Sequence, residues 1–383
     1  MADPLRESDR LSIVCIIHSL DGGGAERVMA GLASRLSSRG HQLSLVTFYD
    51  GVSDRHSVNK GVKRVRLNLS SDANGLLARI RQIRSRHRAI HDTIAELSPD
   101  VVLSFCDRTN MDVLLSSTEF SPPIVVSERS DPARQSLGFT RNLLRKRVYR
   151  RAACVVALTE TSADYLRTFS GHVSVIPSAI GPPPFSSDRS TASDAKTIVG
   201  AGRLESEKGF DRLLNAFAQS TADHPTWRLV IYGDGSQREN LLRQADKLGI
   251  LDRFQLPGWV QPLAEDLSKA TLFCLSSRYE GFPSVLLEAM SMGVPSLSVD
   301  CESGPRAIIL HGRNGFLVES SVRGMADGIS RMITHVKERE AMATVGKKVV
   351  QEFGWKSMVD RYEDVLRDAV TASGHERPTS GSH

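Results

Sequence analysis

Two basic side chains, Arg203 and Lys208, stand five residues apart in the glycine-bounded segment 202–209. An expected buried strand at Thr197–Ala201 precedes them and an expected helix at Phe210–Ala218 follows, which puts both cations at the carboxyl edge of a sheet. Fixed cations at that edge suit a diphosphate, because they stabilise the negative charge that it gains as a leaving group. A solvated loop with ordinary surface charges is the alternative interpretation.

Two carboxylates, Glu280 and Glu288, stand eight positions apart in the segment 278–290, Arg-Tyr-Glu-Gly-Phe-Pro-Ser-Val-Leu-Leu-Glu-Ala-Met. Carboxylate oxygens accept hydrogen bonds, and sugar hydroxyls supply them. The same spacing is common on solvated helix faces, so the pair acquires meaning only from its surroundings. Pro283 fits the first position of a helix at Ser284–Met292, and the N–H groups of the first turn would then face outward toward an anion.

A third segment, 21–27, has the sequence Asp-Gly-Gly-Gly-Ala-Glu-Arg and follows an expected strand at Leu11–Ile17. Gly23 and Gly24 open the helix that comes next, where the backbone can closely approach a phosphate or an acceptor. A glycine-rich turn without a ligand fits equally well, since the segment lacks the full dinucleotide-binding fingerprint.

Short apolar runs alternate with longer amphipathic stretches along the chain, a pattern typical of parallel sheets with helices on both faces. In the first half the runs are Leu11–Ile17, Leu43–Phe48, Val101–Phe105, Ile124–Ser127 and Cys154–Leu158. In the second half they are Thr197–Ala201, Leu229–Tyr232, Leu272–Leu275 and Ser296–Val299, with helices expected near Phe210–Ala218, Gln237–Leu248 and Ser284–Met292. The predicted fold class is α/β, and the second half repeats the architecture of the first without repeating its sequence.

A chain of 383 residues suits two domains of ordinary size. Within 181–193 the composition shifts to Pro, Ser and Asp without periodicity, as in a linker, so we expect one domain at 1–182 and another at 194–354. The polar stretch 373–383 is expected to be a disordered tail. No apolar stretch reaches the roughly 18 residues of a membrane-spanning helix, which favours a cytoplasmic protein.

Taken together, these segments resemble the family-four retaining glycosyltransferases of the GT-B fold. The resemblance runs from about Ile13 to Leu366, and its markers arrive in the order of the family. They are the Gly-Gly-Gly-Ala-Glu-Arg turn at 22–27, the loop 202–209, Gly-Asp-Gly at 233–235, the segment 280–288, and Gly-Val-Pro at 293–295. The resemblance implies two Rossmann-like, doubly wound domains that face a central cleft, with a C-terminal helix, 355–371, that crosses back to complete the N-terminal domain.

The resemblance also implies roles for individual residues. Arg203 and Lys208 would hold the donor diphosphate, Glu288 would bind the ribose, and Glu280 would contact hydroxyls of the transferred sugar. The implied donor-binding backbone comprises Gly23, Gly24, Gly202, Gly233, Gly281, Phe282, Ser284 and Val285. In such enzymes the leaving phosphate is thought to take the proton of the acceptor on the same face, so neither a protein nucleophile nor a metal or other cofactor is needed; the nucleotide sugar is a co-substrate.

The sequence departs from the family pattern at one position. In the loop after the fourth or fifth strand of the N-terminal domain the family often has a histidine. Here the stretch 126–132 reads Val-Ser-Glu-Arg-Ser-Asp-Pro, which makes Glu128 a candidate catalytic residue besides Arg203, Lys208 and Glu280. A capping or salt-bridging role for Glu128 is equally compatible. This stretch resembles that of some family members that act on lipid-linked glycans in bacterial surface polysaccharide pathways, and these members also share the run Asp-Cys-Glu-Ser-Gly-Pro-Arg, found here at 300–306. We therefore expect a UDP-galactose or UDP-N-acetylgalactosamine type of donor and a polyprenyl-diphosphate-linked acceptor.

Two basic clusters lie in the first half of the chain. One comprises Arg79, Arg81, Arg84, Arg86 and Arg88, beside an apolar stripe of Leu76, Ile80, Ile83, Ile90 and Ile94 that we expect in the core. The other comprises Arg141, Arg145, Lys146, Arg147, Arg150 and Arg151, around Leu143, Leu144 and Val148. Such stretches favour docking on anionic lipid at the inner face of the cytoplasmic membrane, with a solvated helix as the alternative. Nucleic acid is not an expected partner, because no aromatic-rich platform or recognition helix accompanies the charge.

Other functions remain compatible with the same fold. A soluble sucrose- or glycogen-type synthase and a nucleotide-sugar epimerase share its architecture, and a nucleotide-sugar-binding protein without catalysis is the option from another class. The joint presence of Arg203, Lys208, Glu280 and Glu288 disfavours the last, because binding alone does not need the complete set.

Overall fold

The structure is a computed structural model that describes residues 9–69, 75–135, 137–184, 196–301 and 303–374. By its internal contacts the chain divides into two units: unit 1 comprises Met1–Ser178 with Lys356–His383, and unit 2 comprises Ala179–Trp355. Most of the expected linker and of the expected tail lies outside the described residues.

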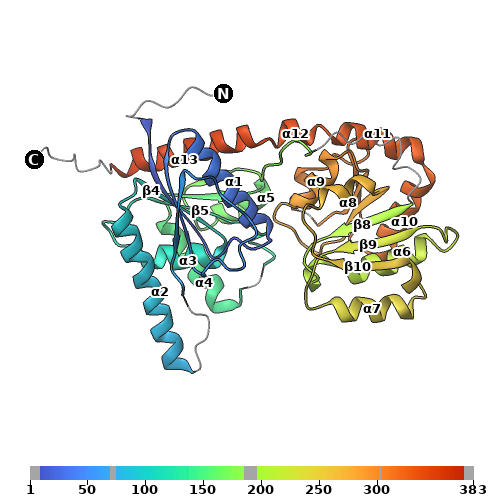
Figure 1. Cartoon of the computed structure of the whole chain (residues 1–383), viewed down its shortest axis with the longest axis horizontal. Coiled ribbons are helices and arrows are strands. Elements are labelled where there is room, and N and C mark those ends of the chain that lie inside the picture. The colour runs from blue at the N-terminus through green and yellow to red at the C-terminus, as the bar shows by residue number, and fades with distance from the viewer. Residues whose placement is uncertain (1–8, 70–74, 136, 185–195, 302, 375–383) are drawn as a thin grey trace, which may run out of the picture. The chain divides into compact units, whose positions relative to one another are not determined.

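Unit 1 contains a seven-stranded parallel sheet in the order β3-β2-β1-β4-β5-β6-β7 (Figure 1). The strands are β1 (Ser12–Ile17), β2 (Gln42–Thr47), β3 (Val62–Arg66), β4 (Val101–Phe105), β5 (Ile124–Ser127), β6 (Cys154–Ala157) and β7 (Val173–Val175). The five strands predicted for this half are confirmed. The two edge strands, β3 and β7, were not predicted, because they are short and largely half-exposed, so neither carries a long apolar run.

The helices of unit 1 are α1 (Gly24–Ser38), α2 (Leu76–Leu97), α3 (Asp107–Ser116), α4 (Phe139–Val148), α5 (Glu160–Arg167) and α13 (Trp355–Ser373), with a 3-10 turn at Tyr149–Arg151. In α1 the apolar spacing produces one buried face, and Gly40 follows the helix with a φ of 105°, as a C-terminal cap requires. The last helix, α13, packs on this unit: the Tyr362 hydroxyl lies 3.0 Å from Ser127 Oγ at the end of β5. The expected return of the C-terminal helix is therefore confirmed.

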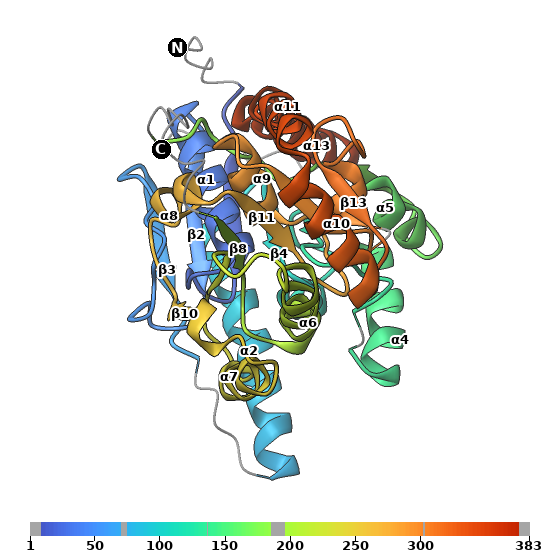
Figure 2. The ribbon, with the colours of Figure 1, turned by 90° about the vertical axis from the view of Figure 1, so that its right-hand side faces the viewer.

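Unit 2 contains a six-stranded sheet in the order β10-β9-β8-β11-β12-β13, in which every pairing is parallel. The strands are β8 (Thr197–Ala201), β9 (Arg228–Tyr232), β10 (Phe254–Gly258), β11 (Leu272–Leu275), β12 (Ser296–Val299) and β13 (Phe316–Val318). The helices are α6 (Phe210–Ser220), α7 (Arg238–Lys247), α8 (Ala264–Lys269), α9 (Ser284–Ser291), α10 (Val322–Thr334), α11 (Val336–Gly346) and α12 (Val349–Glu352), and a 3-10 turn, η4, spans Ser206–Lys208. Helices α6 and α10 pack side by side and bury one set of alternate strand residues (Figure 2).

Each sheet reverses its strand order once, between β1 and β4 in unit 1 and between β8 and β11 in unit 2. Both halves are therefore doubly wound, and the predicted pair of Rossmann-like α/β domains is confirmed. In open α/β sheets ligands bind beyond the carboxyl ends of the strands at such a switch point. The predicted chemical segments follow these strands: 202–209 follows β8, 278–290 follows β11, and 21–27 follows β1.

Candidate functional site

The switch point of the second sheet brings Lys208 and Glu280 into contact. Lys208 ends the η4 turn after β8, and Glu280 lies in the loop after β11, the neighbouring strand. Lys208 Nζ donates a hydrogen bond to Glu280 Oε1 at 2.6 Å, and Ser277 Oγ donates to the same oxygen at 2.6 Å. Both ion-pair partners are mostly buried, with 20% and 10% of their side chains exposed. The two groups predicted from separate segments therefore share one site.

Arg203 belongs to the same loop but points toward solvent. Its Nη2 lies 3.0 Å from Glu207 Oε1, and 76% of its side chain is exposed. An exposed ion pair of this kind contributes about 0–1 kcal/mol to stability, so an incoming phosphate can replace Glu207 at little cost. Lys208 is thus a cation that is already fixed in place, and Arg203 is a cation that can move to contact a bound anion.

Gly202 and Gly233 pack backbone on backbone beside these cations. Gly233 has a φ of 136°, and a Cβ atom there would lie 2.0 Å from the carbonyl oxygen of Gly202. The Leu204 N–H donates to the carbonyl of Asp234 at 2.8 Å, which ties the loop after β8 to the loop after β9. No side chain fits at Gly233, whereas a Cβ at Gly202 would make only ordinary contacts of 3.5 Å with Lys208, so it is the φ of 152° that favours glycine there.

The start of α9 differs by one residue from the prediction. Pro283 is the N-cap, with a φ of −75° and a ψ of 93°, and Ser284 is the first helical residue. The prediction that Pro283 opens the helix was wrong, because its backbone is still extended. Within the described residues, the N–H groups of Ser284 and Val285 have no acceptor, as expected for a first turn that faces a ligand.

Other predicted residues of this segment have separate surroundings. Phe282 is buried and packs edge-on against Phe353, with ring centroids 5.4 Å apart, so only its backbone is available to a ligand. Gly281 is also buried, and its carbonyl oxygen lies close to Gly304. Glu288 is half-buried on α9.

Three predicted site residues lie in unit 1. Gly23 is the N-cap of α1 and Gly24 its first residue. The Glu26 carboxylate folds back over Gly23 and lies 3.3 Å from His18 Nε2. A carboxylate over the first turn of a helix shows that this turn accommodates negative charge.

Glu128, the third of them, is buried within unit 1. The Tyr149 hydroxyl donates to Glu128 Oε1 at 2.6 Å, and Arg145 Nη1 lies 3.8 Å from the same oxygen. Burial raises the pKa of Glu128 to about 7, although the Arg145 charge opposes the shift. This geometry matches the salt-bridging alternative, and a catalytic role for Glu128 stays a prediction.

The sequence did not single out Ser277 or the partner of Arg203. Ser277 is the second residue after β11 and donates to Glu280 three residues later, so its place at the carboxyl edge of a strand was the available signal. Glu207 belongs to the loop already considered, but nothing in its spacing indicated the contact with Arg203.

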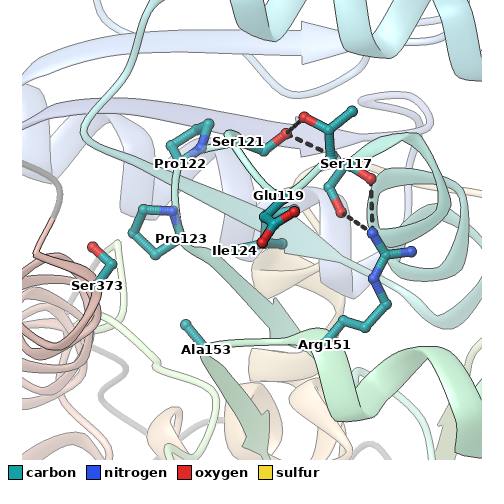
Figure 3. A pocket seen from close by; sticks show the side chains of 10 residues that line it. Ser117, Glu119, Ser121, Pro122, Pro123, Ile124, Arg151, Ala153 and Ser373 are labelled. Carbon is teal, nitrogen blue, oxygen red and sulfur yellow. Dashed lines mark hydrogen bonds between the residues drawn. The ribbon is translucent and has the colours of Figure 1, made fainter.

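A pocket of about 460 Å³ in unit 1 is lined by none of the predicted site residues (Figure 3). Ile124 and Ala153, at the amino ends of β5 and β6, line it together with Arg151, whose Nη2 donates to the carbonyl of Ser117 at 2.7 Å. Because ligand sites of such sheets lie at the carboxyl edge, this pocket at the opposite edge is not the site described above.

Comparison with known families agrees with the geometry. Residues 23–179 match the family described as "Glycosyl transferase 4-like domain", and residues 185–349 match "Glycosyl transferases group 1". Together these two matches span most of both units. The chain belongs to the GT4-type glycosyltransferases.

Relatives of this glycosyltransferase include curated bacterial proteins. It is 28% identical over 312 residues to a protein of Campylobacter jejuni named GalNAc-alpha-(1->4)-GalNAc-alpha-(1->3)-diNAcBac-PP-undecaprenol alpha-1,4-N-acetyl-D-galactosaminyltransferase, covering 80% of this chain and 84% of the relative. It is 35% identical to an exopolysaccharide phosphotransferase of Streptomyces coelicolor, but the match covers 57% of this chain and only 23% of that protein.

Solved structures share the fold of this glycosyltransferase. Sucrose-phosphate synthase of Thermosynechococcus elongatus has a TM-score of 0.83 at 19% identity, covering 95% of this chain and 100% of that one. HepE of Anabaena, in complex with UDP and glucose, has a TM-score of 0.78 at 19% identity, covering 94% and 100%. At this identity the likeness shows the GT-B fold alone.

Helix α4 of the glycosyltransferase exposes large apolar side chains among its cations. Phe139 is 84% exposed and Leu143 is 61% exposed. Arg145, predicted as part of the surface cluster, is instead buried, and its Nη2 donates to the carbonyl of Pro132 at 2.7 Å. That part of the prediction was wrong, because the loop after β5 covers this side of the helix.

Helix α2 buries only part of the apolar stripe predicted for the core. Ile90 and Ile94 are buried, whereas Ile80 and Ile83 are 40% and 48% exposed. The amino-terminal part of the helix extends past the sheet of unit 1 and finds no core to bury it (Figure 1). Among the described residues, no helix has the length and hydrophobicity needed to cross a bilayer.

Proposed function

We propose that this enzyme is a retaining, metal-independent hexosyltransferase that moves a hexose or N-acetylhexosamine from a UDP-sugar to a polyprenyl-diphosphate-linked glycan in surface polysaccharide biosynthesis. The observation that carries the proposal is the contact between Lys208 and Glu280 at 2.6 Å. It puts a cation suited to a departing diphosphate beside a carboxylate suited to a sugar hydroxyl.

The chemistry assigns each group one task. The acceptor oxygen forms a bond to the anomeric carbon while the bond from that carbon to the phosphate oxygen breaks, and UDP departs. The proton of the acceptor hydroxyl passes to the departing phosphate on the same face, which leaves the configuration unchanged. Lys208 and Arg203 stabilise the charge that grows on the diphosphate, as a metal ion does in other transferases. Glu280 orients the sugar, and Glu288 binds the ribose.

The relatives favour this donor and acceptor over the alternatives. The Campylobacter relative is named as an N-acetylgalactosaminyltransferase acting on an undecaprenol-linked glycan, and it matches most of this chain. HepE, with the same fold, binds UDP and glucose. We therefore place UDP-N-acetylgalactosamine and UDP-galactose first among candidate donors.

A donor screen tests the proposal. We expect one of these two UDP-sugars to raise the melting temperature and to be hydrolysed slowly without acceptor, because a ligand of the folded state stabilises it. Proton NMR of the released sugar should show the α-anomer first, as retention of an α-linked donor requires, and EDTA should leave the rate unchanged. Initial release of the β-anomer, or loss of activity with EDTA, would contradict retention or metal independence respectively.

We further propose that unit 1 docks on the inner face of the cytoplasmic membrane through a surface formed by α2 and α4, both of which contact α3. Its exposed apolar side chains are Leu77, Ile80, Ile83, Phe139, Leu143 and Leu144, and its exposed cations are Arg79, Arg81, Arg84, Arg141, Lys146 and Arg147. Apolar side chains enter the headgroup region while each cation contributes about 1 kcal/mol on acidic lipid. This α2–α4 surface would bring the enzyme to a lipid-linked acceptor.

Vesicle flotation tests the α2–α4 surface. We expect the wild-type enzyme to float with vesicles containing phosphatidylglycerol, and the double variant Phe139→Ser, Leu143→Ser to bind at least tenfold more weakly, since each buried side chain contributes about 1.5–3 kcal/mol. The matched control is Leu251→Ser, Leu310→Ser, which removes two exposed leucines of unit 2. Equal recovery of wild type with neutral and acidic vesicles would refute the surface.

A further inference from the structure

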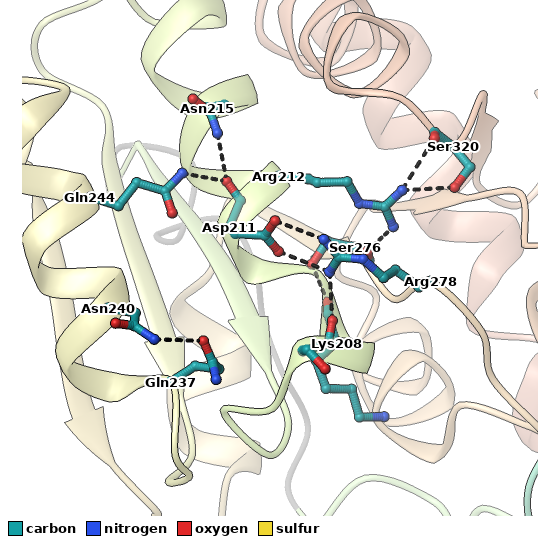
Figure 4. A network of polar contacts seen from close by, with 11 residues as sticks. Lys208, Asp211, Arg212, Asn215, Gln237, Asn240, Gln244, Ser276, Arg278 and Ser320 are labelled. Carbon is teal, nitrogen blue, oxygen red and sulfur yellow. Dashed lines mark hydrogen bonds and ion pairs between the residues drawn. The ribbon is translucent and has the colours of Figure 1, made fainter. Parts of the chain in front are cut away.

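A polar network fastens the η4 turn, which carries Lys208, to the loop after β11 (Figure 4). Arg278 makes a two-pronged ion pair with Asp211 on α6: Nη1 lies 2.9 Å from Oδ1, and Nη2 lies 2.7 Å from Oδ2. Arg278 Nη1 also donates to the carbonyl of Ser206 at 2.5 Å, and its backbone N–H donates to the carbonyl of Glu207 at 2.7 Å. One residue therefore holds two of the three residues of the turn.

The other end of the turn is held from β11 as well. Ser276 Oγ donates to the carbonyl of Lys208 at 2.8 Å. Arg212 in turn holds Ser276, since its Nη2 donates to the Ser276 carbonyl at 2.9 Å and its Nη1 to Ser320 Oγ at 2.9 Å. The backbone on both sides of the Lys208 side chain is thus fixed to the loop that leads to Glu280.

We propose that Arg278 is a positioning residue, which holds the η4 turn in the register that keeps Lys208 Nζ beside Glu280 and within reach of the departing diphosphate. This inference rests on the proposed function. Arg278 itself touches neither Lys208 Nζ nor Glu280 in the described contacts; it acts through the backbone of Ser206 and Glu207.

The exposure of the ion pair between Arg278 and Asp211 indicates that its effect on catalysis is larger than its effect on stability. Arg278 and Asp211 have 40% and 47% of their side chains exposed, and exposed ion pairs add little to stability. Their two parallel hydrogen bonds instead fix the orientation of the guanidinium group relative to the carboxylate, which a single point charge does not. Misplacement of a charge-stabilising group by about 1 Å can cost up to 10²-fold in rate, so a modest shift of the turn has a large kinetic effect.

Lysine at this position is not an equivalent of arginine. Arg278 engages both oxygens of Asp211 and the Ser206 carbonyl at once, whereas one ammonium group on a flexible stem does not hold this planar arrangement. Arg278→Lys keeps the positive charge but removes the paired hydrogen bonds to Asp211. The variant therefore distinguishes the effect of the hydrogen-bond geometry from the effect of the charge.

The test compares steady-state kinetics of Arg278→Gln and Arg278→Lys with a matched control, Arg331→Gln. Arg331 makes a similar exposed, two-pronged pair with Glu338, at 2.8 and 3.2 Å, away from the turn. We expect Arg278→Gln to lower kcat about tenfold with the donor KM within threefold of wild type, Arg278→Lys to fall between, and both to melt within 2–3 °C of the control, as about 1 kcal/mol allows.

Lys208→Ala, measured in parallel, separates the two hypotheses. If Arg278→Gln keeps the kcat of the control while Lys208→Ala is inactive, Arg278 has no positioning role and the proposed function stands. A loss of kcat in Arg278→Gln that only parallels a large fall in melting temperature would also overturn the inference, since it would reflect unfolding. If Lys208→Ala itself retains wild-type turnover, the proposed function fails and takes the inference with it.

Discussion

Replacing Lys208 by alanine is expected to lower kcat by about 10² or more, which is the effect of removing one charge-stabilising group from the departing diphosphate. Only 20% of the Lys208 side chain is exposed, and its ammonium group is held by Glu280 at 2.6 Å. A fixed cation needs no reorganisation as the diphosphate leaves, so its loss acts on the transition state. Turnover should be measured as UDP release with the donor found by the screen.

Lys247→Ala is the control for this variant. Lys247 lies in the last turn of α7, in the same unit, and is exposed. We expect its removal to leave kcat within twofold of wild type, because an exposed cation outside the site is screened by solvent. Wild-type turnover in Lys208→Ala would exclude the role assigned to this cation.

Gly209→Ala is expected to destabilise the protein by about 2 kcal/mol more than Gly249→Ala, and to lower turnover at least tenfold. The two glycines have nearly the same φ, 64° and 65°, so both substitutions cost about 1 kcal/mol for an alanine at positive φ. They differ in the space around them: a Cβ at Gly209 would lie 2.2 Å from the carbonyl oxygen of Ser276, whereas a Cβ at Gly249 would have no neighbour within 4 Å among the described residues other than its immediate neighbours in the chain. Only Gly209→Ala is therefore expected to push the η4 turn, which carries Lys208, away from the loop after β11.

Chemical denaturation and donor turnover of the two variants give the answer. Equal destabilisation would mean that the turn yields without strain, and normal turnover in Gly209→Ala would mean that the spacing between the η4 turn and β11 does not matter for catalysis. Gly249→Ala reports the backbone cost alone, because it shares the φ but lacks the clash.

The sequence predicted the elements whose residues are uniformly buried. Strands such as β4 and β5 are buried along their whole length, so they appear as continuous apolar runs. Edge strand β3 is buried only at Val62 and includes Lys63 and Arg64, so it carries no such run. The stripe on α2 has regular spacing over its full length, but spacing does not reveal where the core beneath the helix ends, and Ile80 and Ile83 are exposed.

For the candidate site, the carboxyl edges of parallel strands and the family resemblance predicted that Lys208 and Glu280 lie together. The network behind them was not predictable in this way. Asp211 and Arg278 are 67 residues apart, and although Arg278 opens the segment 278–290, no spacing links it to Asp211. Their pairing depends on the adjacency of β8 and β11 in the folded sheet. Arg145 shows the same limit: its basic neighbours suggested a surface, but Glu128 and the Pro132 carbonyl hold it inside.

In the salt bridge between Lys208 and Glu280, the Glu280 carboxylate competes with the diphosphate of the substrate for the ammonium group of Lys208. Any nucleotide that binds the ammonium group has to displace a carboxylate that is always present at high local concentration. After the bond between the sugar and UDP has been cut and the sugar has left Glu280, the carboxylate can pair with Lys208 again. We therefore expect product inhibition by UDP to be weaker than the affinity for intact donor would suggest, because the donor engages Glu280 through its sugar and UDP leaves it free to reclaim the lysine.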